Sequence, residues 1–185
     1  MGRPTDWHLV HYGERARGGV GAVIVEATGV TPEGRISVNC LSLHDDAQIP
    51  SFARLAEVIH AGGARAFIQL NHAGRKGSTA AGWKIGEGRP RVEEGGWEPL
   101  APSPIPFAPG DPAPRTLDET GIGDVIEAFA RATHRALAAG FDGPILCSEP
   151  SARLLPIVLE DAFRLSISRD QDQLERYLKV VEQRI

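Results

Sequence analysis

Two uninterrupted apolar runs constrain the fold of this chain more than any other feature of the sequence. They cover residues 20–27 and 64–70, and each one ends in a cluster of small and polar residues. Short runs that are apolar throughout are typical of strands covered on both faces, as in a parallel sheet. We therefore predict two parallel strands whose carboxyl ends share a site, because ligands of parallel α/β folds bind at that edge.

Helical patterns alternate with these strands. Apolar residues recur at helical spacing over residues 5–17, from about 46 or 51 to 60, and over about 116–139. Thr5 or Asp6 can cap the first of these helices, and Gly18 can end it. A further short strand is predicted to begin at Phe141. The helix–strand order predicts a parallel α/β fold, since the connections are long enough for crossovers.

Residues 74–116 form a long stretch that is rich in proline and glycine. We predict a loop without regular structure, and a compact domain tolerates such a loop mainly where it covers a site. Its two tryptophans, Trp83 and Trp97, either fill gaps beneath the loop or face a substrate.

Composition excludes several classes of function. The chain has 185 residues, of which 42% are hydrophobic, enough to bury the core of one domain or slightly more. A net charge of −4 with scattered arginines predicts no nucleic-acid partner. No apolar run approaches the roughly 20 residues of a membrane span, and the N-terminus has no apolar targeting segment, so we expect a cytoplasmic protein. Cys40 and Cys147 are far apart, which argues against a metal or disulfide framework.

Five ordered blocks carry a family resemblance. They are residues 7–12 (WHLVHY), 25–35 (VEATGVTPEGR), 68–76 (IQLNHAGRK), 101–105 (APSPI) and 138–142 (AAGFD). Together they resemble the Old Yellow Enzyme family of FMN-dependent NADH:flavin oxidoreductases. The resemblance implies part of a TIM (β/α)8 barrel over residues 4–143, with about strands two to four and their helices. Residues 144–185 diverge from the family and are predicted to form a helical tail.

The resemblance implies three cofactor-binding residues. Gln69 matches the glutamine that hydrogen-bonds the pyrimidine edge of the flavin, where a carboxamide offers both a donor and an acceptor. Ala27 matches the small residue beside the isoalloxazine ring. Arg75 lies in the family's His-Ala-Gly-Arg turn, where its cation can pair with a loop carboxylate or support the anionic flavin. FMN is the implied cofactor, NAD(P)H the reductant, and an activated alkene the small-molecule substrate.

The residues also allow plainer interpretations. Gln69 can be a strand-end amide that satisfies loop backbone. His8 and His11, three residues apart, can form one face of a metal site or a packed helical pair. His72 can either orient its loop or approach the site. No catalytic residue is assigned from the sequence.

The chain also departs from the family pattern. The family's first strand, which carries flavin contacts, has no counterpart after Met1. Cys147 and Pro150 stand where the family has its substrate-binding pair, and neither donates hydrogen bonds well. Loss of the pattern after about residue 143 suggests a truncated, frameshifted or spliced product.

Three functions therefore remain open at the level of the sequence. The first is an FMN-dependent NAD(P)H oxidoreductase of the ene-reductase type, inactive if the truncation removes too much of the barrel. The second is a non-enzymatic barrel remnant that forms homo-oligomers through its exposed sheet edges. The third is a different barrel enzyme with a phosphorylated ligand.

Overall fold

The computed structural model describes residues 2–83, 89–90, 92–141 and four positions of the C-terminal tail, 172, 175, 176 and 179. The chain divides into two compact units, Met1–Asp142 and Gly143–Ile185. In the second unit, the four described residues are helical. The strand predicted beyond Phe141, together with Cys147 and Pro150, lies outside the described residues.

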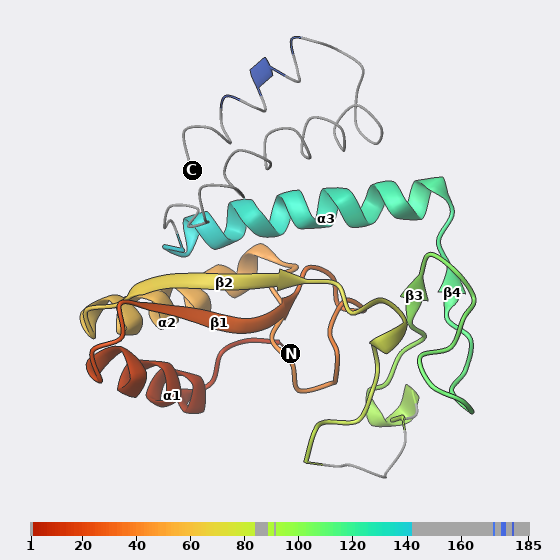
Figure 1. Ribbon diagram of the computed structural model, residues 1–185, viewed down its shortest axis with the longest axis horizontal. Coiled ribbons are helices and arrows are strands. Elements are labelled where there is room, and N and C mark those ends of the chain that lie inside the picture. The colour runs from red at the N-terminus through yellow and green to blue at the C-terminus, as the bar shows by residue number, and fades with distance from the viewer. Residues whose placement is uncertain are drawn as a thin grey trace, which may run out of the picture. The chain divides into compact units, whose positions relative to one another are not determined.

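Alternating helices and strands build the first unit (Figure 1). In chain order they are α1 (Asp6–Arg17), β1 (Ala22–Gly29), α2 (Ile49–Ala61), β2 (Arg65–Asn71), β3 (Leu100–Ala101), β4 (Arg115–Thr116) and α3 (Glu119–Ala138). Strands β1 and β2 pair in parallel, as the sequence predicts. The α-helices of this unit start and end within about three residues of their predicted bounds. Thr5 and Asp118, whose residue types favour N-caps, stand at the starts of α1 and α3.

One hydrophobic core joins the helices to the strand pair. Phe52, Leu55 and Ile59 of α2 are fully buried, and so is Val25 of β1. Burying a side chain of this size contributes roughly 1.5–3 kcal/mol. The side of β1 that faces α1 and α2 is therefore the one that holds the unit together.

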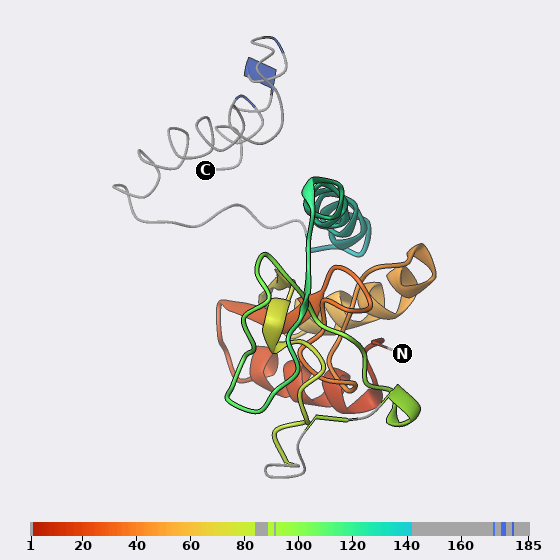
Figure 2. The ribbon, with the colours of Figure 1, turned by 90° about the vertical axis from the view of Figure 1, so that its right-hand side faces the viewer.

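The other side of β1 is open within the described residues. Residues alternate between exposed and buried from Ala22 to Glu26, and Ile24 is 67% exposed. The prediction of a strand covered on both faces is wrong for this stretch. The physical reason is visible in Figures 1 and 2, in which α1, α2 and α3 follow one another around one side of the strand pair.

Small residues bring α3 close to its neighbours. Ala128, Ala132 and Ala136 recur every fourth residue and are buried. Ala136 joins the main core, whereas Ala128 and Ala132 pack with Val30, which follows β1. Ile122 on the same helix is 45% exposed. An alanine stripe thus lets the helix lie close to the strand ends.

Strand β1 pairs with β2 along one edge, and other parts of the protein satisfy hydrogen-bonding groups along its opposite edge. The backbone N–H of Glu26 donates to the hydroxyl of Tyr12 at 2.9 Å. At Gly29, the N–H donates to the carbonyl of Leu41 and the carbonyl accepts from the N–H of Leu43, both at 2.9 Å. Unpaired strand edges invite pairing with other chains. These contacts confine the open part of the edge to the start of β1.

The loop over residues 74–116 is more ordered than its composition predicts. It contains β3 and β4, which pair in parallel, so the expectation of no regular structure is wrong there. The guanidinium of Arg89 donates to the carbonyls of Arg75 and Gly77 and pairs with Asp111 at 3.0 Å. The hydrogen bond from Arg89 to the carboxylate of Asp111 holds the pKa of Asp111 below its usual value. One arginine therefore ties the turn after β2 to a remote part of the loop.

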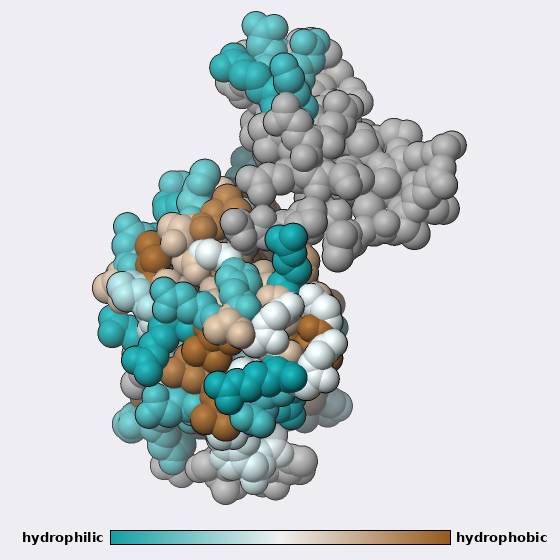
Figure 3. Space-filling model, turned by 90° about the vertical axis from the view of Figure 1, so that its left-hand side faces the viewer, coloured by the Kyte–Doolittle hydropathy of each residue, from teal (hydrophilic) through white to brown (hydrophobic). Residues whose placement is uncertain are grey.

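Exposed apolar side chains are dispersed on one end of the unit. Figure 3 views the end at which β1 and β2 begin, and its brown areas are separated by hydrophilic side chains.

No helix in the described part of the chain is long and apolar enough to cross a bilayer.

Candidate functional site

A β-bulge sets two of the predicted site residues beside each other. Val25 pairs with Ile68 and Thr28 pairs with Leu70, so Glu26 and Ala27 together lie opposite Gln69. Bulges are frequent next to functional sites, where they change the direction of a side chain. Ala27 is partly buried, whereas Gln69 is exposed. No hydrogen bond within the described residues occupies the carboxamide of Gln69.

Gly34 joins the segments that follow the two strands. Its carbonyl accepts hydrogen bonds from the backbone N–H of Ala73 at 2.9 Å and from the Asn71 carboxamide at 3.3 Å. A Cβ at position 34 would lie 3.0 Å from Cδ2 of His72 and 3.0 Å from the hydroxyl of Thr31. A side chain at this position would require the histidine ring or the Thr31 hydroxyl to shift by a few tenths of an ångström.

His72 lies at this junction as a neutral imidazole. The N–H of Gly74 donates to its Nδ1 at 3.2 Å, which leaves the ring proton on Nε2. Burial lowers the pKa of His72 below its ordinary value. The buried Nε2 has no hydrogen-bond partner among the described residues. His72 thus orients its own turn, and it also holds one unused donor near the end of β2.

Arg75 is placed apart from the bulge. It lies in the short 3₁₀ turn Gly74–Lys76 and is exposed. Its carbonyl is held by Arg89, and no described contact joins its side chain to Ala27 or Gln69. The structure therefore brings together two of the three predicted cofactor-binding residues.

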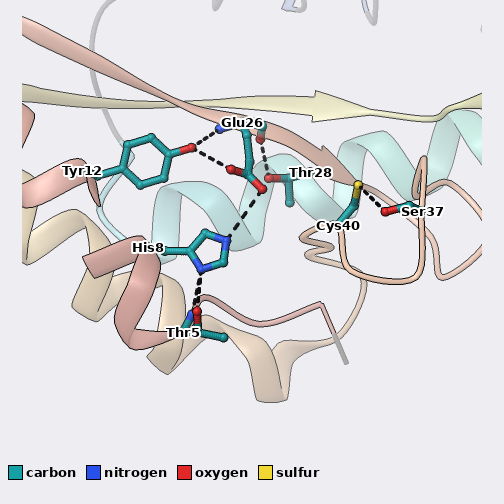
Figure 4. A network of polar contacts seen from close by, with 7 residues as sticks. All are labelled: Thr5, His8, Tyr12, Glu26, Thr28, Ser37 and Cys40. Atoms are coloured by element: carbon teal, nitrogen blue, oxygen red, sulfur yellow. Dashed lines mark hydrogen bonds and ion pairs between the residues drawn. The ribbon is translucent and has the colours of Figure 1, made fainter. Parts of the chain in front are cut away.

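A polar network on Glu26 is the feature that the sequence did not reveal (Figure 4). The hydroxyl of Tyr12 donates to Oε2 of Glu26 at 3.0 Å, and Nε2 of His8 lies 3.7 Å from Oε1. Burial raises the pKa of Tyr12 to about 12. The N–H and hydroxyl of Thr5 both face Nδ1 of His8, at 3.0 and 2.9 Å, so the proton of His8 is on Nε2. The spacing of Tyr12 and Glu26 across two elements gives no local signal of this contact.

The network decides the interpretation of the two N-terminal histidines. His8 caps α1 together with Thr5, and His11 stacks on Trp7 with ring centroids 4.4 Å apart. Within the described residues, no three His, Cys, Asp or Glu side chains are arranged to hold a metal ion. The capping contact of His8 and the stacking of His11 on Trp7 support the packed helical pair.

A cavity of about 730 Å³ lies beside this network. It is lined by Thr5 and His8 at the start of α1, by Glu26 of β1, and by residues of the 36–40 and 80–83 loops. Ala27, Gln69 and Arg75 are not among its lining residues. The cavity is therefore distinct from the bulge that carries the predicted flavin contacts.

The parallel strands, the helices packed on them and the polar groups at the strand ends define a helix-flanked α/β protein. The chain belongs to the NADH:flavin oxidoreductase / NADH oxidase family, whose family model matches residues 1–146. This confirms the resemblance to Old Yellow Enzymes. FMN is the cofactor of this family and NAD(P)H its reductant.

Curated relatives agree with the family. The chain is 43% identical over 141 residues to an NADPH dehydrogenase of Listeria monocytogenes serotype 4a (strain HCC23), covering 76% of this chain and 37% of that protein. It is 40% identical over 141 residues to an NADPH dehydrogenase of Geobacillus thermodenitrificans (strain NG80-2), with the same coverage of 76% and 37%. The chain thus spans little more than a third of the length of these relatives.

Solved structures give the same result. Morphinone reductase matches with a TM-score of 0.61 at 30% identity, over 77% of this chain and 38% of that one. The old yellow enzyme homologue from Zymomonas mobilis matches with a TM-score of 0.58 at 27% identity, again over 77% and 38%.

Proposed function

We propose that this chain forms the wall of an FMN site in an NAD(P)H oxidoreductase of the ene-reductase type. The observation that carries the proposal is the placement of Ala27 beside Gln69 at the bulge. A small residue there leaves room for a flat ring, and the exposed carboxamide of Gln69 offers the donor and acceptor that a pyrimidine edge requires. Membership of the NADH:flavin oxidoreductase family supports FMN as the cofactor.

The residues present fit this part of the flavin. Gln69 would bind the pyrimidine edge and orient the ring, and Ala27 would pack against the ring face. Arg75, exposed on the turn after β2, would supply a cation to the anionic region. Bound FMN would supply the chemistry of hydride transfer between NAD(P)H and an activated alkene.

The same proposal extends to the architecture. Strands β1 and β2 would be strands two and three of a (β/α)8 barrel, with α1, α2 and α3 in its outer layer. The barrel part would cover residues 4–143 and the divergent tail residues 144–185. In this arrangement the exposed Ile24 would face the barrel interior.

A cytoplasmic location remains a prediction.

An alternative function is a non-enzymatic partial barrel that associates with other copies. The open side of β1 at Ala22 and Ile24 favours it, since an uncovered part of a sheet invites contact with another chain.

FMN binding to the purified chain separates the two proposals. We expect a flavin absorbance spectrum after FMN is added and free FMN is removed. Ala27→Leu should abolish binding, because the larger side chain occupies the ring position. The matched control is Ala22→Leu, which places the same side chain at the exposed start of β1 and should bind FMN normally.

Gln69 is tested in the same assay. Gln69→Leu preserves the size of the side chain and removes its hydrogen bonds, so FMN affinity should fall about tenfold or more. A chain that folds and does not take up FMN would favour the non-enzymatic alternative. Equal FMN affinity in Ala27→Leu and Ala22→Leu would place the flavin elsewhere.

A further inference from the structure

The cavity beside Glu26 has the dimensions of a small-molecule site. Its volume of about 730 Å³ is within the range of ligand pockets, roughly 300–1,000 Å³. It lies between the first turn of α1, the C-terminal half of β1 and two loops. The FMN proposal makes no use of it, since none of its predicted contacts lines this space.

The charge of the cavity is negative. Among the described residues that line it, Glu26 is the group with a formal charge when His8 is neutral. Tyr12 holds one oxygen of the Glu26 carboxylate, and His8 approaches the other. The side chain of Glu26 is nevertheless 41% exposed, so the carboxylate remains accessible to a ligand.

Two indole rings complete the lining. Trp7 is 60% exposed and Trp83 is 76% exposed, and both line the cavity. Trp7 is held in place by stacking on His11 and by an edge contact with His8 at 5.2 Å. The faces of tryptophan rings attract cations more strongly than those of other aromatic residues.

Two hydroxyl groups of the lining already make contacts within the protein. The hydroxyl of Thr5 contacts Nδ1 of His8, and the hydroxyl of Ser37 contacts Sγ of Cys40 at 3.4 Å. A primary ammonium group needs several acceptors, whereas a quaternary ammonium needs none. Apolar residues such as Ile36 and Ala81 suit the methyl groups of the latter.

We propose that this cavity binds a small quaternary ammonium cation, with the charge near the Glu26 carboxylate and the methyl groups against Trp7 and Trp83. The site is separate from the proposed FMN wall, and its occupation does not require flavin.

Calorimetric titration of the full chain with choline, in the absence of FMN, tests the proposal. The comparison ligand is 3,3-dimethylbutan-1-ol, which has the shape of choline without its charge. We expect saturable binding of choline and at least about tenfold weaker binding of the alcohol, since only the cation gains from the carboxylate. Absence of saturable choline binding, or equal affinity for the two ligands, would overturn the proposal.

Two substitutions locate the site. Trp83→Leu should weaken choline binding about two- to fivefold through loss of a cation–π contact at an exposed ring. Phe107→Leu is the matched control, because Phe107 is 46% exposed and does not line the cavity. Glu26→Gln should weaken choline binding at least about tenfold. Its fold is checked by circular dichroism, because Glu26 also contacts Tyr12.

Trp83→Leu keeps the test decisive even if Glu26→Gln does not fold. Unchanged choline affinity in Trp83→Leu would remove the cavity as the binding site. Because FMN is absent throughout, failure of choline binding would leave the proposed flavin function unaffected.

Discussion

Removal of the Tyr12 hydroxyl is the sharpest test of how α1 is attached to β1. This hydroxyl accepts from the backbone N–H of Glu26 at 2.9 Å and donates to the Glu26 carboxylate at 3.0 Å. Tyr12 is 6% exposed, so in Tyr12→Phe the ring stays packed and only these two hydrogen bonds are lost. The variant therefore measures the polar part of the contact.

The expected cost follows from the surroundings of each bond. A neutral hydrogen bond contributes about 0.5–1.5 kcal/mol, and one to a charged group about 1.5–3 kcal/mol. The Glu26 carboxylate is 41% exposed, so water can partly replace the hydroxyl and the lower end of the second range applies. We expect Tyr12→Phe to lower the free energy of unfolding by about 2 kcal/mol.

Urea denaturation followed by circular dichroism measures this change. With a slope of about 2 kcal/mol per molar urea, the midpoint should fall by about 1 M. The control is a double-mutant cycle with Glu26→Ala, which keeps the backbone N–H and removes the carboxylate. Tyr12→Phe should cost about 1.5 kcal/mol less in that background. A loss below about 0.5 kcal/mol in the wild-type background would refute the proposed attachment.

Four further predictions concern pH, local packing and a helix cap. Because the pKa of Tyr12 is raised to about 12 by burial, the folded state holds this proton more tightly than the unfolded state. Stability should be undiminished below pH 10 and fall from about pH 10 to 12, and urea midpoints across this range should fall less steeply for Tyr12→Phe. Gly62→Ala should destabilise the fold by about 1–3 kcal/mol, because its Cβ would lie 2.5 Å from Cβ of Ala16 and 3.0 Å from backbone atoms of α1. Gly123→Ala should instead stabilise it by about 0.5–1 kcal/mol, since this helical position has nothing within 4 Å, and thermal melts showing the same sign for both glycines would contradict the packing. Asp118→Ala should cost about 1 kcal/mol by removing the N-cap bond to the N–H of Gly121, and unchanged helix stability in denaturation would show that the cap is dispensable.

Local signals predicted the elements of the first unit well. Thr5 and Gly18 mark the ends of α1, and Asp118 caps α3, as their residue types indicate. The bounds of β1 were less accurate, since the observed strand begins and ends two residues after the predicted run. Its limits depend on remote partners, because Gly21 accepts from Arg65 and Gly29 bonds to Leu41 and Leu43.

In the candidate site, too, local sequence signals identified residues, whereas contacts between remote segments decided their arrangement. The resemblance pointed to Ala27, Gln69 and Arg75, and their roles toward FMN remain predictions. Their grouping depends on the bulge opposite Gln69, which apolar periodicity does not reveal. The contact of Tyr12 with Glu26 joins a helix to a strand and has no sequence motif of its own.

The sequence by itself determined the order of helices and strands and the family, because caps, glycine stops, apolar periods and ordered motifs are all local properties of the chain. Tertiary structure alone decided that one side of β1 is open and that Gln69 lies beside Ala27. It also decided that Glu26 closes a network with α1 next to a cavity. These features depend on register, bulges and close approach between segments far apart in sequence, and such contacts form only when the chain packs.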